Sequence, residues 1–529
     1  MENKRRYRFK QQPIFDSSSF LKVFRELKVS ESHAYRVWRY LIQKNVKEFS
    51  DIPDIPKRIL EEIQLNFKLL TSNIVQSHTT DDGNTTKLII RLQDGHEIET
   101  VIMRYDRCND VAKKSENKNL DTLEVPNLPI YRRVSLCVSS QIGCRIGCTF
   151  CATGTLGLGG SLVTGEIIEQ VYHAINILNE PVKNVVFMGM GEPLENYNEV
   201  VDAIKILLDT RLYGLSPSKI SISTVGIPSG IVNMADDLPG VGLCLSLHAP
   251  DQVLREQIVP IAKMYKISEL IRSTDIFIAK SILNKFIKKI TDQRNNRTEI
   301  KIDNLESTII SPKWFNSHST VMIEYILIKD VNDSINHAKA LANLLNNTYT
   351  DKNDINMIFE RCIQSERLEK KVAKSFQKAF LDNYKRSNFI FVNILPYSET
   401  NATPKYATPS EGKVRTFCRI LNNYGIVVTV RRKMGQDIGG ACGQLAFKGK
   451  IKEIQDDDEY SDDNKSDNYN KSYFSIYKSL YSIFKPKPAL FNLANKYIIL
   501  INISIGSLIF TTGIIGLSMY YRRKKSTTP

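Results

Sequence analysis

The sequence predicts an α/β protein whose main body is a partial (β/α)6 barrel, preceded by a small N-terminal helical and β domain. From about residue 133 onward, strand-like apolar runs alternate with helical patterns, which is the order expected of βαβ units in a parallel sheet. Six such runs are too few to close an eight-unit barrel, which favours a partial one. The runs are Val134–Val138, Val185–Met188, Ile220–Thr224, Gly242–Leu247, Val321–Ile328 and Phe389–Leu395.

Residues 1–104 are expected to form an accessory domain. Apolar residues recur with a helical period between residues 20 and 70, and residues 72–103 look β-like. In the β-like stretch, Lys87–Leu92 and Ile98–Met103 flank the turn signal Asp94–Gly95. The polar stretch 105–130, which holds Pro126 and Pro129, is expected to be a loop or insertion.

The barrel is expected over residues 131–450, with helices between the strands and two interruptions. Helical patterns cover Gly165–Leu178, Tyr197–Leu208 and Asn336–Leu345. Residues 266–318 and 350–388 are rich in Lys and Asn and show no steady period, so we expect surface insertions there. Their basic residues either contact RNA or form a solvated flank, and the solvated flank is favoured.

The C-terminal region is expected to be a linker followed by a membrane span. Residues 451–496 begin as an acidic low-complexity linker. Residues 497–521 contain no charged side chain and, as a helix, would be long enough to cross a ~30 Å hydrocarbon core. The alternative is a buried core helix. Only eight residues follow Tyr521, so we expect a tail anchor. Arg522–Lys525 favour a cytosolic C-terminus and hence translocation of the rest of the protein. The missing signal peptide argues against translocation, so we expect the rest of the protein on the cytosolic or organelle-interior face.

Composition excludes a disordered or secreted disulfide-rich protein. The chain has 529 residues, 42% hydrophobic and 24% charged, which is typical of a globular protein. Its net charge of +15 suits a polyanionic partner, or else reflects basic residues spread over a solvated surface. Residues 1–10 have no apolar signal-peptide core. Three of the nine cysteines fall within eight residues, which indicates metal or cluster ligation in a reducing compartment.

Cys144, Cys148 and Cys151 are spaced for an iron–sulfur cluster. Structural zinc prefers four ligands in paired blocks, and no second pair lies nearby in the sequence. Three thiolates on a tight loop hold three irons of a [4Fe–4S] cluster and leave the fourth iron open to a ligand. Zinc remains the minor alternative.

The cysteine loop, with Phe150 before its last cysteine, resembles the signature of radical SAM enzymes. Further motifs narrow the resemblance to the RlmN family, the dual-specificity RNA adenosine-C2 methyltransferases. It covers roughly residues 20–104 and 131–448, less the insertions. The motifs are Leu136–Cys144, Met188–Leu194, Ser223–Gly226, Ser246–Pro250 and Arg431–Leu445.

The resemblance implies a mechanism that uses two molecules of S-adenosyl-L-methionine (SAM). One methylates Cys442, and the reduced cluster cleaves the other to a radical that abstracts hydrogen from the S-methyl group. The resulting methylene adds to C2 of adenine, Glu99 removes the C2 proton, and Cys137 attacks Cys442 to release the product through a disulfide. Thiolate nucleophilicity suits both cysteines to these steps. Read singly, Cys137 would be a small buried hydrophobe and Glu99 a solvated carboxylate at a strand end.

The resemblance also implies a SAM-binding set. Gly191 permits close backbone approach and Glu192 can accept from the substrate ammonium. Ser398 stands where the family has asparagine, and the shorter side chain puts that contact in question. Arg431, Arg432 and Lys433 would suit phosphate contacts or form a solvated strand end. The SAM-contacting positions carried over are Gly191, Glu192, Ser223, Ser246, Leu247, His248 and Ser398.

The function implied is the formation of 2-methyladenosine in large-subunit ribosomal RNA, in transfer RNA, or in both. The N-terminal domain would bind RNA, an electron donor such as flavodoxin or ferredoxin would reduce the cluster, and a monomer is expected. Two alternatives stay open: a radical SAM enzyme that methylates C8 of adenosine, and an inactive iron–sulfur protein that only binds RNA. The cysteines that match no motif, Cys108, Cys244, Cys362 and Cys418, are interpreted as structural or incidental.

Overall fold

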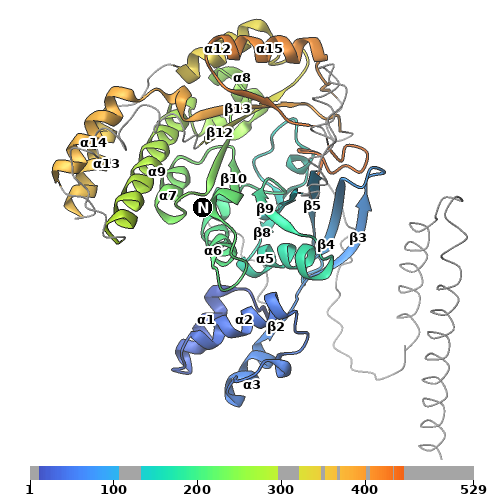
Figure 1. Cartoon of the computed structure of the whole chain (residues 1–529). Coiled ribbons are helices and arrows are strands. Elements are labelled where there is room, and N and C mark those ends of the chain that lie inside the picture. The colour runs from blue at the N-terminus through green and yellow to red at the C-terminus, as the bar shows by residue number, and fades with distance from the viewer. Residues whose placement is uncertain are drawn as a thin grey trace, which may run out of the picture. The chain divides into compact units, whose positions relative to one another are not determined.

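A ten-stranded mixed sheet organises the protein (Figure 1). The computed structural model describes residues 11–105, 133–295, 321–346, 352–365, 370–400, 405–432 and 434–445. All of these lie in one compact unit, Met1–Lys452. The strand order is β14-β13-β12-β11-β10-β9-β6-β5-β4-β3.

Every predicted core strand is present, and the six run parallel to one another. A short further strand that was not predicted, β14 (Val428–Val430), pairs in parallel with β13. The six strands are β6 (Arg133–Cys137), β9 (Val182–Phe187), β10 (Ile220–Thr224), β11 (Gly242–Ser246), β12 (Val321–Leu327) and β13 (Ile390–Pro396).

The N-terminal strands extend the same sheet instead of forming a separate β domain. β3 (Asn73–Thr79), β4 (Thr85–Arg91) and β5 (Glu97–Tyr105) are antiparallel, and β5 pairs with β6 so that Val101 lies opposite Cys137. The domain boundary expected at residue 104 therefore falls inside a continuous sheet. The physical reason is that β5 is buried on both faces, and a partner strand on its second edge satisfies its backbone groups.

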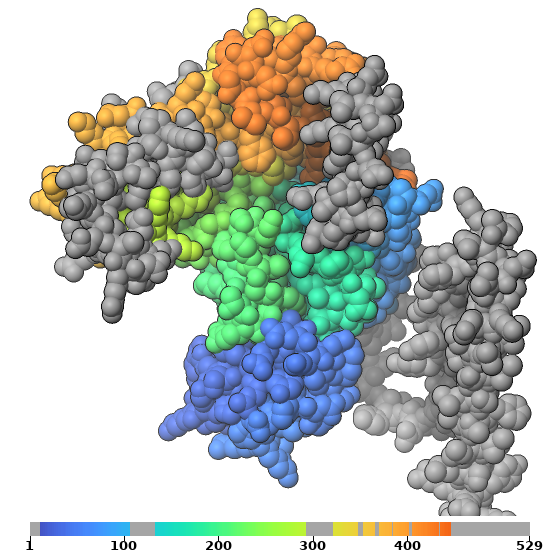
Figure 2. Space-filling view, in the orientation of Figure 1, coloured from blue at the N-terminus to red at the C-terminus, as the bar shows by residue number. Residues whose placement is uncertain are grey.

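Three helices form an N-terminal lobe beside the sheet (Figure 2). They are α1 (Ser17–Glu26), α2 (Ser32–Lys44) and α3 (Lys57–Asn66), followed by β2 (Phe67–Lys68), which pairs with β1 (Gln12–Pro13). The buried Trp38 donates its indole N–H to the carbonyl of Ile14 at 2.8 Å, and Phe20 meets Phe67 edge to face. These helices match the amphipathic pattern of the sequence.

The predicted core helices also match. The chain forms α5 (Thr164–Tyr172), which continues as the π-helical turn η3 (His173–Ile177), and α6 (Tyr197–Leu208). α12 covers Ile335–Asn346. The main unit also contains α7 (Pro228–Asp237), α8 (Gln252–Ile258), α15 (Glu411–Asn423) and the hairpin of β7 (Gln141–Cys144) and β8 (Gly157–Ser161).

The prediction of a surface insertion at residues 266–318 is wrong for the first part of this range. Residues Ile267–Asn295 form a long helix, α9, which packs against α7 on one side and α13 (Lys352–Gln364) on another. Phe286 of α9 stacks on Phe376 of α14 (Lys370–Asn383), with ring centroids 3.9 Å apart. Because α9 is buried on more than one face, its apolar residues do not follow a single stripe, so no period was visible.

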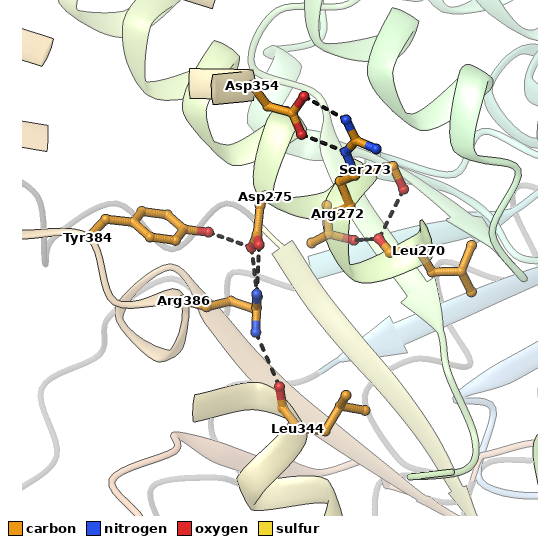
Figure 3. Close-up of polar contacts among 9 residues, drawn as sticks. Leu270, Arg272, Ser273, Asp275, Leu344, Asp354, Tyr384 and Arg386 are labelled. Carbon is orange, nitrogen blue, oxygen red and sulfur yellow. Dashed lines mark hydrogen bonds and ion pairs between the residues drawn. The ribbon is translucent and has the colours of Figure 1, made fainter. Parts of the chain in front are cut away.

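Two ion pairs, one of them buried, hold these added helices in place (Figure 3). The Asp275 carboxylate on α9 accepts two hydrogen bonds of 2.6 Å from Arg386 and one of 2.5 Å from the Tyr384 hydroxyl. Arg386 also donates to the carbonyl of Leu344 at the end of α12, at 3.1 Å. Arg272 and Asp354 form a second, bidentate pair between α9 and α13. Residues 350–388, which were also expected to be a surface insertion, therefore contain packed helices that ion pairs hold in place.

The expected linker and membrane span, 451–496 and 497–521, lie outside the described residues, as does nearly all of the expected loop 105–130. Within the described ranges, no helix has both the length and the apolar composition needed to cross a bilayer.

Candidate active site

The three motif cysteines share one pocket with most of the predicted SAM-contacting residues. Cys144 ends β7, and Cys148 and Cys151 lie in the loop that leads to β8. The pocket sits at the carboxyl ends of the parallel strands, where α/β proteins commonly bind ligands. Of the predicted residues, it is lined by Cys144, Cys148, Cys151, Gly191, Glu192, Ser223, Ser246, His248 and Cys442.

The cysteine loop is built close to its own hairpin. Gly143 has a φ of +68°, and a Cβ there would lie 2.0 Å from the carbonyl oxygen of Gly157, so only glycine fits. The Phe150 ring meets His248 edge to face at 5.0 Å, and this fixes the loop against the β11 end.

The environment of the thiols fits iron ligation. Burial raises the pKa of Cys144 to about 12 and that of Cys148 well above its ordinary value. Thiolates in such a site need a cationic partner, which iron would supply. In the described part of the chain, no three His, Cys, Asp or Glu side chains converge on a point suited to a single metal ion. A cluster does not require this convergence, because each cysteine binds a different iron.

Glu192 is held in the pocket by backbone hydrogen bonds. Its carboxylate accepts from the amides of Leu194 and Val225, each at 2.9 Å. Its own amide donates to the Gln141 side chain at 2.9 Å. Burial raises the pKa of Glu192 to about 7, an effect that these hydrogen bonds only partly offset. A bound ammonium group would favour the carboxylate form.

Ser223 and Ser246 converge on a carboxylate that sequence reasoning missed. The Ser223 hydroxyl lies 3.1 Å and the Ser246 hydroxyl 3.5 Å from Oε2 of Glu324, which is buried on β12. Glu324 lines the same pocket. The available signal was a single carboxylate inside the apolar run Val321–Ile328, because a buried carboxylate requires polar partners.

Arg255 is a second residue that the sequence did not single out. It is buried on α8 and donates to the carbonyls of Leu247 and Val225, at 3.0 and 2.5 Å. The guanidinium therefore joins the two strand ends that carry the predicted SAM-contacting residues Ser223 and Ser246. It also brings positive charge near Cys148. No motif marks Arg255, since its partners are backbone carbonyls.

His248 is a neutral hydrogen-bonding group in this site. Burial lowers its pKa to about 3. Its Nδ1 accepts from the amide of Ile326 at 3.1 Å, and its backbone has a φ of +62° that turns the chain sharply after β11. Leu247 beside it is fully buried in the hydrophobic core and is not among the pocket-lining residues.

Cys442 lies in a segment, residues 434–445, that we call the Cys442 loop. Hydrogen bonds tether it directly beyond the cluster ligands: Ala152 N–H donates to Gly443 O at 2.7 Å, and the Thr153 hydroxyl donates to Leu445 O at 2.6 Å. On another side, Gln436 donates to the Ser398 hydroxyl at 2.9 Å. Ser398 therefore helps to hold this loop and lines a neighbouring pocket that also includes Cys442.

Cys137 is the last residue of β6 and is buried, whereas Cys442 is exposed. Burial raises the pKa of Cys137 to about 12, and local desolvation raises that of Cys442 to about 11. Cys442 also raises the pKa of Cys137, and neither thiol is in a disulfide. Neither described pocket counts Cys137 among its lining residues.

Glu99 lies near Cys137 on the adjacent strand. It is two residues from Val101, the partner of Cys137, so their side chains share one face of the sheet. Glu99 is 1% exposed, and its Oε1 is 3.9 Å from the ammonium of Lys87. Lys87 also reaches the carbonyl of Gly439 at 3.5 Å. The lysine thus connects Glu99 to the Cys442 loop.

The comparisons with known proteins agree with this geometry. The Radical SAM superfamily model matches residues 138–283. The chain is 33% identical to "Ribosomal RNA large subunit methyltransferase N" of Nitrosopumilus maritimus, over 77% of this chain and 89% of the relative. It is 31% identical to "Probable dual-specificity RNA methyltransferase RlmN" of Thermus thermophilus, over 78% and 88%.

A solved structure is similar over nearly its whole length. The crystal structure of a radical SAM methyltransferase from Sphaerobacter thermophilus matches with a TM-score of 0.58 and 27% identity, covering 82% of this chain and 99% of that one. The cysteine pocket, the paired thiols and these relatives together lead to one assignment. The chain belongs to the RlmN family of radical SAM RNA methyltransferases.

Proposed function

We propose that this protein methylates C2 of adenosine in large-subunit ribosomal RNA, transfer RNA or both. The observation that carries the proposal is the pocket in which Cys442 joins the three cysteines of the cluster motif. An exposed nucleophile beside a cluster site has no purpose in a simple RNA-binding protein. The family relationship supplies the substrate class.

The cofactors follow from the donor set. Cys144, Cys148 and Cys151 would hold a [4Fe–4S] cluster, and Gly191, Glu192, Ser223, Ser246 and His248 would surround SAM. Together these groups supply one-electron cleavage of SAM, with electrons from a carrier such as flavodoxin or ferredoxin.

The protein's own residues carry the later steps. Cys442 carries the transferred carbon and becomes covalently joined to the RNA base through it. Glu99 accepts the C2 proton, and Lys87 places a positive charge beside its carboxylate. Cys137 then attacks the Cys442 sulfur, which frees the methylated base and leaves a transient disulfide.

Two other functions predict different products. A C8-specific enzyme would use the same thiols and yield 8-methyladenosine. An inactive RNA-binding protein would yield no methylated base. The presence of Cys137 and Cys442 near one site favours the enzymes, because a binding protein gains nothing from the pair.

Mass spectrometry of nucleosides tests the proposal. Full-length protein is reconstituted anaerobically and incubated with SAM, a reductant and either ribosomal or transfer RNA. We expect 2-methyladenosine with wild type and none with Cys442→Ala. Cys418→Ala is the matched control, because Cys418 lies on α15 and lines neither pocket. An 8-methyl product, or no product despite SAM cleavage, would contradict C2 specificity or methyl transfer respectively.

We also infer a membrane anchor at residues 497–521 and RNA binding by the N-terminal helices. The anchor is supported by 25 residues without charge followed by four basic ones. Alkaline extraction of membranes should release a chain ending at residue 496 and retain the full chain. Equal release of both chains would refute the anchor.

RNA affinity that survives removal of residues 1–70 would refute RNA binding by the N-terminal helices.

A further inference from the structure

The guanidinium of Arg431 lies across the strand end that carries Cys137. β6 runs between β5 and β9 in the sheet. Arg431 contacts the sulfur of Met103 on β5 at 4.0 Å and the sulfur of Met188, just beyond β9, at 3.8 Å. These two methionines flank Cys137 on opposite sides, so the guanidinium spans the strand between them.

Two interactions hold Arg431 in this place. Its backbone amide donates to the carbonyl of Ile394 at 2.9 Å, which continues the pairing of β14 with β13. Its Nη1 lies 4.0 Å from Oε1 of Glu324. Glu324 is itself positioned by Ser223 and Ser246. The cation is therefore fixed by the sheet and by a buried carboxylate, independently of the Cys442 loop.

Arg431 also acts on both thiols. It lines the pocket that contains Cys442. Its charge lowers the pKa of Cys137 and of Cys442, whereas Glu324 raises both, and burial is the largest effect on each. Besides these groups, Tyr105 on β5 adjoins the guanidinium, and the Lys87–Glu99 pair occupies the same sheet face. A buried thiol needs such a cation to react as thiolate.

We propose that Arg431 is a positioning residue for product release, which stabilises negative charge on the sulfur of Cys137 as this sulfur attacks Cys442. Glu324 pairs with the guanidinium and partly offsets its positive charge at the sulfur. The inference rests on the proposed function. It concerns a step that neither the cluster nor SAM performs.

The step balances as a thiol–disulfide reaction. The Cys137 thiolate attacks the sulfur that joins Cys442 to the methylene on adenine C2. The S–S bond forms as the C–S bond breaks, and the C–S electron pair goes to the methylene carbon. A proton from water completes the methyl group. A dithiol reductant then returns the disulfide to two thiols before the next cycle.

The first test follows the covalent protein–RNA adduct. Wild type, Arg431→Gln, Arg431→Lys and the control Arg415→Gln are quenched during turnover, and denaturing gels measure the adduct. Arg415 is an exposed arginine on α15 paired with Glu411. We expect Arg431→Gln to lengthen the adduct lifetime roughly tenfold near pH 7, since one pKa unit changes the thiolate fraction tenfold. Higher pH should shorten it again, and Arg431→Lys should restore most of the rate.

The second test needs no turnover. The full chain is alkylated with iodoacetamide across pH, and mass spectrometry of peptides follows Cys137 and Cys442. Arg431→Gln should move the half-maximal pH upward, and Glu324→Gln should move it downward. A merely structural role would not give shifts of opposite sign. The alkylation test also remains usable if Arg431→Gln does not fold, because Arg431→Lys and Glu324→Gln can still be measured.

The outcomes separate the two proposals. Alkylation shifts of the same sign, no shift, or an adduct that does not accumulate in Arg431→Gln would overturn the role of Arg431. If wild type yields neither adduct nor 2-methyladenosine, the proposed function fails. The alkylation profiles then still decide whether Arg431 and Glu324 control the two thiols.

Discussion

At the scale of single residues, Gly191 shows how little space the cysteine-lined pocket allows. Its φ is +96°, and a Cβ there would lie 2.5 Å from Cβ of Gln141, whose side chain holds the Glu192 amide. A larger residue must displace that strand. The glycine is therefore required by the backbone whatever it contributes to ligand binding.

We predict that Gly191→Ala abolishes SAM binding, measured by equilibrium dialysis with the anaerobic protein. Gly95→Ala is the matched control, because Gly95 has a φ of +83° and no atom within 4 Å of an added Cβ. The control should cost about 1–2 kcal/mol of stability from backbone strain alone and bind SAM normally. Equal SAM affinity in both variants would show that the contact with Gln141 is unimportant.

Single residues also show how much of the site could be predicted from the sequence. The cysteine spacing and the motifs around it singled out Cys144, Cys442 and Gly191, because strict chemistry or backbone geometry selects these residue types. Glu324, Arg255 and Lys87 were missed. The partners of Glu324 lie 78 or more positions away in the chain, and Arg255 bonds to backbone carbonyls. Lys87 connects Glu99 to Gly439, which is 352 positions away. None of these relationships leaves a local pattern.

At the scale of elements, a buried ion pair is one of the contacts that attach α9. The Asp275 and Arg386 side chains are 0% and 1% exposed, and the arginine also caps the end of α12. Removing one member leaves the other charged and buried without its partner's charge, which is more costly than never having built the pair.

We predict that Arg386→Met lowers the free energy of unfolding by about 3–5 kcal/mol. Arg25→Met, which breaks the exposed pair with Glu31, should cost at most about 1 kcal/mol. Denaturant unfolding followed by circular dichroism measures both. Adding Asp275→Asn to Arg386→Met should recover part of the loss, and no recovery would mean that packing, not charge, dominates.

The helices and strands differed in how well the sequence predicted them. The parallel strands, such as Ile220–Thr224, were predicted almost to the residue, because a short apolar run between turn signals has few other structures open to it. α9 was not, because burial on several faces removes the helical stripe. The pairing of β5 with β6 was also missed, since no local signal says which edge a strand will find.

At the scale of the whole molecule, a buried carboxylate links stability to pH. Glu169 on α5 accepts from the amides of Thr71 and Ser72, at 2.9 and 2.8 Å, and from both of their hydroxyls. The Ser72 hydroxyl also lies 3.0 Å from Nε2 of His173. The cluster ties the segment between the N-terminal helices and β3 to the barrel. Burial raises the pKa of Glu169 to about 7.

The sign of the effect follows from proton uptake. Because the folded pKa of about 7 exceeds the ordinary value of 4.5, the folded state binds the proton more tightly. This contribution to stability is complete below about pH 4.5 and is lost as pH rises to about 7. Burial lowers the pKa of His173 to about 4, which acts in the opposite sense below pH 6.5.

We predict that the stability difference between wild type and Glu169→Gln narrows by about 2 kcal/mol between pH 4.5 and pH 7.5. Comparing the two proteins cancels the effect of His173, which both retain. Urea unfolding at the two pH values provides the measurement. A difference that widens with pH would show that the four hydrogen-bond donors outweigh desolvation.

The hydrogen bonds that hold the Cys442 loop also determine how late in synthesis this loop can be fixed. Lys87 and Gly439 are separated by 352 positions, and Ala152 and Gly443 by almost 300. A ribosome releases the cluster cysteines long before it reaches Cys442, and contacts between such distant segments form last. During synthesis the three motif cysteines therefore emerge well before the segment that carries Cys442, so the Cys442 loop can be fixed only after nearly all of the described chain has been made.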